Sequence, residues 1–204
     1  MLMIKEALVV KRAVLFKNNH FTGFVSADKY NFISSIMQNY FYHERGERLE
    51  NDSSLQQIIP YVWIINPLDK KVFAYKRADG KNYAEKRLCN KWSCGLGGHI
   101  EKKDASDPIV AGMMRELNEE VKMSEYPRPR IVGYLNLDYG VHAVHFGIVA
   151  VAETTGDVQK GDNEMVHGQL YSISELEQIF SNPENEIEEW TKASWPFVKE
   201  LLSK

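Results

Sequence analysis

One stretch of the chain joins a glycine-dense segment to a helix with clear signals at both ends. Three glycines lie within residues 95–98, where the backbone can turn sharply and approach a ligand. We expect a helix over about 107–122, because Asp107 can cap its N-terminus and Pro108 suits its first turn. Pro127 enforces a break soon afterwards. A chain with this pattern must place a short helix directly beside a flexible, ligand-accessible loop.

The expected helix carries two different faces. Projected at about 100° per residue, three glutamates (Glu116, Glu119 and Glu120) share one arc. Three carboxylates so close repel one another unless water or a cation offsets the charge. A hard cation such as Mg²⁺ prefers oxygen ligands, so a solvated face and a metal site both fit. The apolar stripe expected to face the core comprises Val110, Met114, Leu117 and Val121, with Met113 at its edge.

The N-terminal part contains fewer signals. Branched residues over 7–16 predict a strand, and apolar spacing over 28–42 predicts a helix. Residues 43–56 are polar without a clear pattern. We therefore interpret 1–56 as an N-terminal extension and 57–204 as the main domain.

The main domain mixes strands and helices. Residues 58–65 and 71–77 predict a hairpin, with Pro60 marking an edge or a bend. Strands alternating with a few helices favour an α/β (α+β) fold with a mixed sheet between helices. The remaining expected elements are strands over 130–137, 142–153 and 167–172, and helices over 174–180, capped by Ser174, and over 186–202.

Composition excludes several classes of protein. A formal net charge of −3 argues against a nucleic-acid partner, which would require a basic surface. The chain has no apolar run near the roughly 20 residues of a membrane span and no pattern typical of a signal peptide. Cys89 and Cys94 are too few for a disulfide framework and fit free thiols. We expect a cytoplasmic protein without a membrane or nucleic-acid partner.

The run Arg115–Met123, with Gly97-Gly98-His99-Ile100-Glu101 before it, resembles the signature of the Nudix hydrolase superfamily (MutT-like phosphohydrolases). That signature reads Gly, five residues, Glu, seven residues, then Arg-Glu-apolar-any-Glu-Glu-any-Gly-apolar. The second half is matched by Arg115, Glu116, Leu117, Glu119, Glu120 and Met123. The resemblance extends over roughly 57–204.

The box is slightly divergent. Lys122 occupies the position of the final glycine, so the end of the helix should differ from the family pattern. Gly98 lies seventeen residues before Arg115, three more than the family spacing, which indicates a small insertion. Asp107 stands where the family has its first glutamate, and either Asp107 or Glu101 could replace that carboxylate.

The resemblance implies a Nudix-type α/β/α sandwich with a mixed sheet. It also implies a metal-dependent hydrolase that cuts a diphosphate linkage in a nucleoside diphosphate derivative or a related phosphorylated metabolite. Mg²⁺, with Mn²⁺ as an alternative, would be held by Glu116, Glu119, Glu120 and the backbone of Gly98. Arg115 and Glu119 would act in catalysis, Arg115 by orienting the glutamates.

Further residues complete the predicted site. Glu164 lies in a downstream loop where some members of the family carry a general base, although a solvated loop acid is an equal interpretation. Arg77 and His99 are candidates for binding the anionic groups of the substrate. His142 and His145 should point to opposite faces of one strand and serve structure. The extension at 1–56 could add strands, shape the pocket or form a homodimer contact.

Two other functions remain open. One branch of the fold isomerises isopentenyl diphosphate with a cysteine near a histidine, which Cys94 and His99 could supply. Other members of the fold sense nucleotides without cutting them. The retained glutamates favour the hydrolase.

Overall fold

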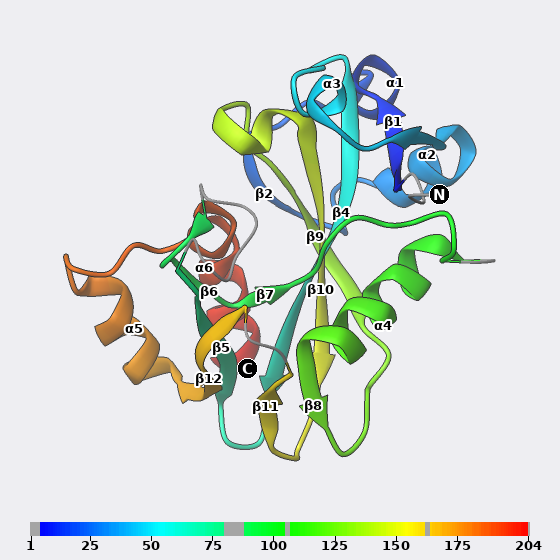
Figure 1. The fold of residues 1–204 in the computed structure, drawn as a ribbon. Helices are drawn as coiled ribbons and strands as arrows, with labels where there is room; N and C mark the ends of the chain where they lie inside the picture. The colour runs from blue at the N-terminus through cyan, green and yellow to red at the C-terminus, as the bar shows by residue number, and fades with distance from the viewer. Residues whose placement is uncertain (1–4, 80–87, 105–106, 162–163, 204) are drawn as a thin grey trace.

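The computed structural model describes residues 5–79, 88–104, 107–161 and 164–203. At its centre lies β4 (Leu55–Asn66), whose twelve residues are all buried. It pairs in parallel with β10 (His145–Glu153) and antiparallel with β5 (Lys71–Arg77), as Figure 1 shows. A strand that is buried on both faces needs a nearly continuous run of apolar residues, and the run in β4 explains its position at the centre of the sheet.

The main sheet is mixed. Its principal path runs β12-β5-β4-β10-β9-β2, and all these pairs except β4–β10 are antiparallel. The other strands on this path are β12 (Met165–Ser172), β9 (Arg130–Asn136) and β2 (Gly23–Ser26). Off the path, β1 (Glu6–Lys11) pairs with β3 (Phe41–Glu44) and with β4, while β6 (Trp92–Ser93) pairs with β5 and β7 (Gly95–Leu96) with β4. A separate two-stranded sheet joins β8 (Val121–Met123) to β11 (Val158–Lys160).

Helices cover both faces of the main sheet. Along β4, Ile58 and Ile64 face one hydrophobic cluster, whereas Ile59 and Ile65 face another. The first cluster includes α4 (Pro108–Glu120), α1 (Arg12–Phe16) and α2 (Phe32–Asn39). The second includes α5 (Ile173–Ser181) and α6 (Glu189–Ser203). This arrangement confirms the predicted α/β/α sandwich with a mixed sheet (Figure 1).

Residues of the N-terminal extension belong to the same core. Leu8, Phe16 and Phe32 lie in the cluster that also holds α4 and β10. The rings of Phe16 and Phe32 both contact Phe146, with centroids 5.8 and 5.2 Å away. The interpreted boundary at residue 56 falls within β4, so the extension and the main domain share a central strand.

Two predictions for the extension were wrong in detail. The expected strand over 7–16 ends at Lys11, where α1 begins and turns Leu15 and Phe16 into the core. The expected helix over 28–42 is limited to α2, because its last residues pair with β1 as β3. Asn31 caps α2 by accepting a hydrogen bond from the Ser34 amide. The short helix α3 (Glu47–Glu50) lies in the polar segment that showed no pattern.

The predicted hairpin is confirmed, and the expected edge at Pro60 is wrong. Ile65 pairs with Val72, and the side chain of Asn66 organises the turn by accepting hydrogen bonds from the next residues. Pro60 lies within the central strand, where β10 accompanies it on one side. On the other side the partner of β4 changes from β1 to β7. Pro60, which has no backbone N–H to donate, therefore lies between these two sets of inter-strand hydrogen bonds.

Smaller differences concern helix starts and strand limits. Ser172 rather than Ser174 caps α5, in a reciprocal capping box with Glu175. Residues 140–144 form a 3-10 helix, so His142 precedes the strand that His145 opens. Within the described residues, no helix is long and apolar enough to cross a membrane.

Candidate active site

The α4 helix begins where the sequence predicted and ends slightly earlier. The side chain of Asp107 accepts a hydrogen bond from the Val110 amide, and Pro108 occupies the first turn. The helix ends at Glu120, and Val121 is extended, with φ −133° and ψ 159°. The chain passes directly into β8, so no residue at 122 needs the left-handed conformation that favours glycine. This explains how Lys122 can stand in that position.

The buried stripe of α4 differs from the predicted one. Ile109, Met113 and Leu117 are almost fully buried, whereas Val110 and Met114 are only partly so. This small rotation of the helix brings Glu116 to the edge of the core, where it is 8% exposed. Burial raises the pKa of Glu116 above its ordinary value, partly opposed by the neighbouring Arg115. A carboxylate in such a place needs a positive partner.

Arg115 supplies that partner and joins the site together. Its Nη1 donates to Glu116 Oε1 at 2.8 Å and to Glu119 Oε2 at 3.0 Å. Its Nη2 donates to the backbone oxygen of His99 at 2.8 Å. Its Nε donates to Asp104 Oδ1 at 3.0 Å, and Nη2 also donates to Asp104 Oδ2 at 3.2 Å. A single planar guanidinium therefore orients three carboxylates and one loop carbonyl.

The glycine-dense loop lies directly against this helix. A Cβ atom placed on Gly98 would be 2.6 Å from Glu116 Oε1, so only glycine fits there without displacing the carboxylate. A Cβ on Gly97 would be 1.8 Å from the backbone oxygen of Pro60. These approaches place the backbone of the loop within reach of any ion or anion bound by the glutamates.

Glu120 occupies the end of the helix beside a second loop. Its backbone oxygen accepts a hydrogen bond from the Gly161 amide at 2.7 Å. The segment after Gly161 leads to Glu164, whose backbone oxygen accepts from the Ala78 amide at 2.8 Å. The loop that carries the candidate base is thus attached to α4 at one end and to the β5 edge at the other. Residues 162 and 163 lie outside the described part of the chain.

Asp104 is a member of the Arg115 arrangement that sequence reasoning missed. Its side chain is only 4% exposed, and besides Arg115 it accepts a hydrogen bond from the Glu101 amide at 2.8 Å. The two residues considered for this role lie elsewhere, since Asp107 caps the helix and the carboxylate of Glu101 faces Lys103. All three acids are spaced three residues apart, so spacing offered no signal that favoured Asp104.

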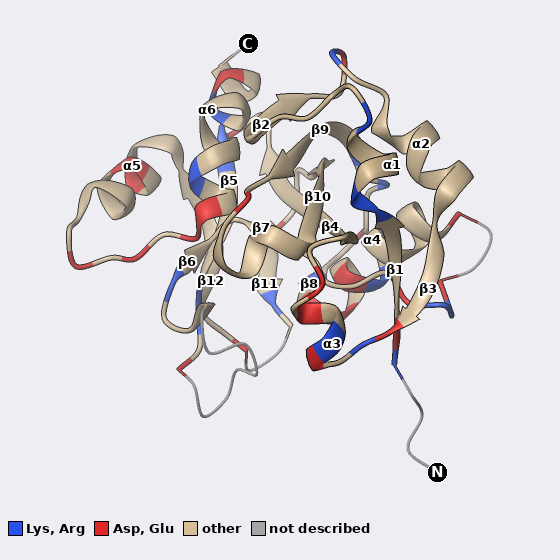
Figure 2. Ribbon diagram, turned by 90° about the horizontal axis from the view of Figure 1, so that it is seen from above, with Lys and Arg blue, Asp and Glu red and all other residues tan. Residues whose placement is uncertain are grey.

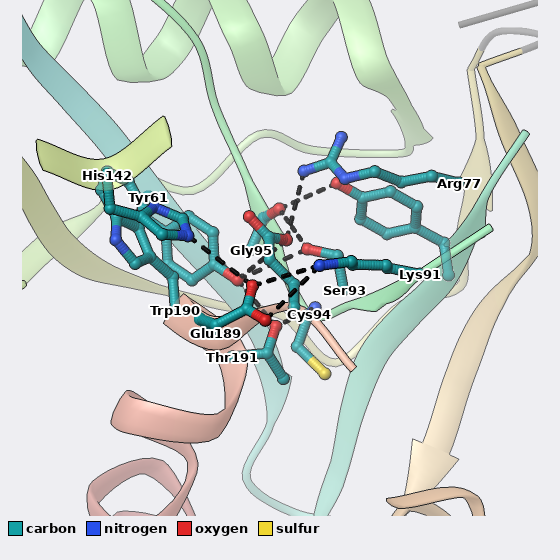
Figure 3. Close-up of polar contacts among 12 residues, drawn as sticks. Tyr61, Arg77, Lys91, Ser93, Cys94, Gly95, His142, Glu189, Trp190 and Thr191 are labelled. Atoms are coloured by element: carbon teal, nitrogen blue, oxygen red, sulfur yellow. Dashed lines mark hydrogen bonds and ion pairs between the residues drawn. The ribbon is translucent and has the colours of Figure 1, made fainter. Parts of the chain in front are cut away.

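Arg77 belongs to a polar network between the sheet and α6 (Figure 3). Its Nη2 lies 3.3 Å from Glu188 Oε2, and that carboxylate also lies 3.5 Å from the hydroxyl of Tyr61. The Tyr61 hydroxyl is 2.7 Å from Thr191 Oγ1. Lys91 and His142 reach the neighbouring Glu189 at 3.4 and 3.6 Å. The structure therefore places Arg77 beside α6.

The side chain of His99 contacts Gln57 and His145. Its Nε2 lies 2.7 Å from Gln57 Oε1, and its ring contacts His145 edge-on at 5.7 Å. Burial, together with nearby cationic groups, holds the pKa of His99 well below its ordinary value. The backbone of His99, by contrast, is part of the Arg115 arrangement.

Cys94 is not presented as a nucleophile. It is 1% exposed and packs in the cluster that includes α6, and burial raises its pKa well above the ordinary value. Its sulfur points away from the polar contacts in Figure 3. A thiol in such surroundings is inert, so the structure does not support the isomerase alternative.

Acidic and basic residues are interspersed along the described chain (Figure 2). The short helix α3, for example, carries Glu47, Arg48 and Glu50 in one turn. This mixed pattern agrees with the near balance of charges in the sequence.

No family model matches the chain. It is 31% identical to Protein YmaB of Bacillus subtilis (strain 168), over 98% of each chain. The crystal structure of Tm1382, a candidate Nudix hydrolase, is 28% identical and covers 96% of this chain and 99% of its own, with a TM-score of 0.75. The Nudix domain of Shewanella oneidensis NrtR shares the fold, at 11% identity and a TM-score of 0.53 over 77% of this chain and 92% of that one. Together with the Arg115–Glu120 arrangement on α4, the similarity to Tm1382 over nearly the whole of both chains shows that the chain belongs to the Nudix superfamily.

Proposed function

We propose that the protein is a divalent-metal-dependent hydrolase that cuts a diphosphate linkage in a nucleoside diphosphate derivative. Membership of the Nudix superfamily supports a hydrolase of this general kind. The observation that carries the proposal is the Arg115 guanidinium, which holds Glu116, Glu119, Asp104 and the His99 carbonyl in one rigid arrangement. A merely solvated acidic face would need no such support.

The residues present fit a hard divalent cation. Glu116 and Glu119 converge on one nitrogen of Arg115, and the backbone of Gly98 lies so close to Glu116 that an added Cβ would be 2.6 Å from its Oε1. We propose that Glu116, Glu119, Glu120 and the Gly98 carbonyl bind Mg²⁺ or Mn²⁺, since oxygen ligands suit both. When bound, such an ion neutralises phosphate charge and makes a bound water more acidic.

The chain's own residues divide the remaining work. Arg115 orients the glutamates and, being held by Asp104, keeps its position without substrate. Glu164 would accept the proton of the attacking water, from a loop attached to the end of α4 through Gly161. Arg77 is proposed to bind an anionic group of the substrate, whereas the His99 ring is held by Gln57 and only the His99 backbone takes part in the Arg115 arrangement. For Arg77 this requires sharing its guanidinium with Glu188.

A nucleotide-like diphosphate is the favoured substrate class. The NrtR Nudix domain was crystallised with ADP ribose. A Francisella tularensis protein of the same fold, at 14% identity and a TM-score of 0.52, is a bifunctional NMN adenylyltransferase and ADP ribose pyrophosphatase complexed with AMP and a Mn ion. These ligands belong to those proteins, and they indicate which compounds to test first on this chain.

The test is a panel assay with Mg²⁺ and with Mn²⁺. It covers nucleoside triphosphates, ADP-ribose and other sugar nucleotides, dinucleoside polyphosphates and coenzyme A, and it scores which bond breaks. Glu120→Gln should lower kcat by at least about 100-fold, because losing a metal ligand removes several kcal/mol of transition-state stabilisation. Glu125→Gln, an exposed residue beyond the helix, is the matched control and should retain turnover.

Two results would contradict the proposal. The first is turnover that persists in Glu120→Gln or without any divalent cation. The second is tight nucleotide binding that needs no cation and yields no product, which would favour a nucleotide sensor. Full turnover of Glu164→Gln would remove that residue as the base and leave the rest of the proposal standing.

A further inference from the structure

A second group of metal-binding side chains lies where the N-terminal extension meets the sheet. One carboxylate oxygen of Glu50 and one ring nitrogen each of His99 and His145 all lie within 4.8 Å of one another. Glu50 ends α3, His99 follows β7, and His145 opens β10. Three distant parts of the sequence therefore supply one side chain each, and tertiary structure alone brings them together.

Hydrogen bonds determine which nitrogen of each ring can bind a metal. Nδ1 of His145 lies 2.6 Å from the Val141 carbonyl, which only accepts, so this nitrogen carries the proton and Nε2 carries the lone pair. Nε2 of His99 lies 2.7 Å from Gln57 Oε1, so its lone pair is on Nδ1. The Gln57 amide nitrogen donates to Glu50 Oε1 at 3.3 Å, which fixes the orientation of the amide.

The supporting residues are rigid and buried. Gln57 is fully buried in β4, and it lies opposite His145 in the pairing of β4 with β10. Metal-binding histidines usually donate their second N–H to a carbonyl or carboxylate, which fixes the ring for the metal. Both imidazoles have such an acceptor here, and the same glutamine also holds the carboxylate. This double use of Gln57 distinguishes the cluster from a chance meeting of polar side chains.

We propose that Glu50, His99 and His145 bind a second metal ion, a transition metal such as Zn²⁺, Co²⁺ or Fe²⁺. Two neutral imidazoles and one carboxylate suit these borderline ions, whereas Mg²⁺ prefers oxygen ligands alone. Three protein ligands leave at least one coordination position for water. The site goes beyond the proposed hydrolase activity, which uses the glutamates of α4.

The site would connect the extension to the catalytic helix. His99 supplies its side chain to the second site and its carbonyl to Arg115 Nη2 at 2.8 Å. A bound ion would therefore hold α3, β7 and β10 together and fix the loop that orients Arg115. Binding to the native state alone must also raise the melting temperature.

Co²⁺ is a suitable probe because its visible absorption reports nitrogen ligands. The chelator-treated full chain is titrated with Co²⁺ in excess Mg²⁺, and bound cobalt is counted after dialysis by elemental analysis. We expect one Co²⁺ per chain, with affinity lowered about 10–100-fold by Gln57→Met. Glu50→Gln and His99→Asn, which remove a ligand itself, should lower it at least as much. Co²⁺ should raise the melting temperature of the native chain and leave that of Glu50→Gln unchanged.

Matched controls separate this site from the glutamates of α4. Glu47 lies on the same short helix as Glu50 and is exposed, so the variant Glu47→Gln should bind Co²⁺ like the native chain. Glu120→Gln should lose turnover and keep the cobalt spectrum. The proposal is overturned if the native chain holds no stoichiometric Co²⁺ in excess Mg²⁺, or if Glu50→Gln and His99→Asn, folded by circular dichroism, bind it with native affinity.

Discussion

Replacing Asp104 with asparagine should destabilise the protein and disable the site through Arg115. The Asp104 carboxylate is nearly inaccessible to solvent and accepts hydrogen bonds from Arg115 Nε, Arg115 Nη2 and the Glu101 amide. Removing one partner of a buried ion pair costs about 3–5 kcal/mol. Asparagine keeps one acceptor oxygen, and two glutamates still face Arg115, so we expect about 3 kcal/mol. For a chain of this size that corresponds to a melting temperature lower by about 6–12 °C.

Turnover should fall with stability, since a guanidinium released on one side no longer positions Glu116. A displacement of about 1 Å is enough to cost about 100-fold in kcat. Thermal unfolding by circular dichroism measures the first effect, and metal-dependent turnover well below the melting temperature measures the second. The control is Asp107→Asn, because asparagine caps a helix as well as aspartate and the residue is exposed. If Asp107→Asn damages the protein as much as Asp104→Asn does, the assignment of Asp104 is refuted.

Three further predictions concern other parts of the structure. Gly98→Ala should raise the Mg²⁺ concentration for half-maximal turnover about tenfold, because the new Cβ displaces Glu116, and an unchanged Mg²⁺ titration would contradict this. Burial lowers the pKa of His142 below 6.5, so the unfolded chain binds its proton more tightly and stability is lost as the pH falls below 6.5. The free energy of unfolding, measured in urea between pH 5 and 7, should rise with pH less steeply in His142→Phe than in the native chain, by up to about 1.4 kcal/mol per pH unit. Parallel plots for the two proteins would count against this prediction. Tyr61→Phe should cost about 1–2 kcal/mol in urea unfolding by removing the hydroxyl that meets Thr191 in the core, and an unaltered midpoint would show that this contact contributes nothing.

Local signals predicted the central elements well. The cap at Asp107 and the proline after it located the start of α4, and the turn chemistry of Asn66 identified the β4–β5 hairpin. These features depend on residues within a few positions of one another. Their signals are local, so the sequence alone was enough to locate them.

Elements that depend on long-range packing were harder to predict. Residues 12–16 have strand-like composition, yet they form α1 because Phe16 packs among Phe21, Phe32 and Phe146. Similarly, the last residues of the expected helix at 28–42 pair with β1 and form the strand β3. Propensity is a weak preference that such contacts override.

The candidate site shows the same division. The period of a helix is known in advance, so Arg115, Glu116, Glu119 and Glu120 could be placed together from their spacing alone. The path of a loop is not known in advance: the sequence offered Glu101 and Asp107 for the missing carboxylate, and the fold instead places Asp104 against Arg115. The cluster of Glu50, His99 and His145 could not be predicted from any pattern in the sequence, because three separate segments must pack together before these side chains come close.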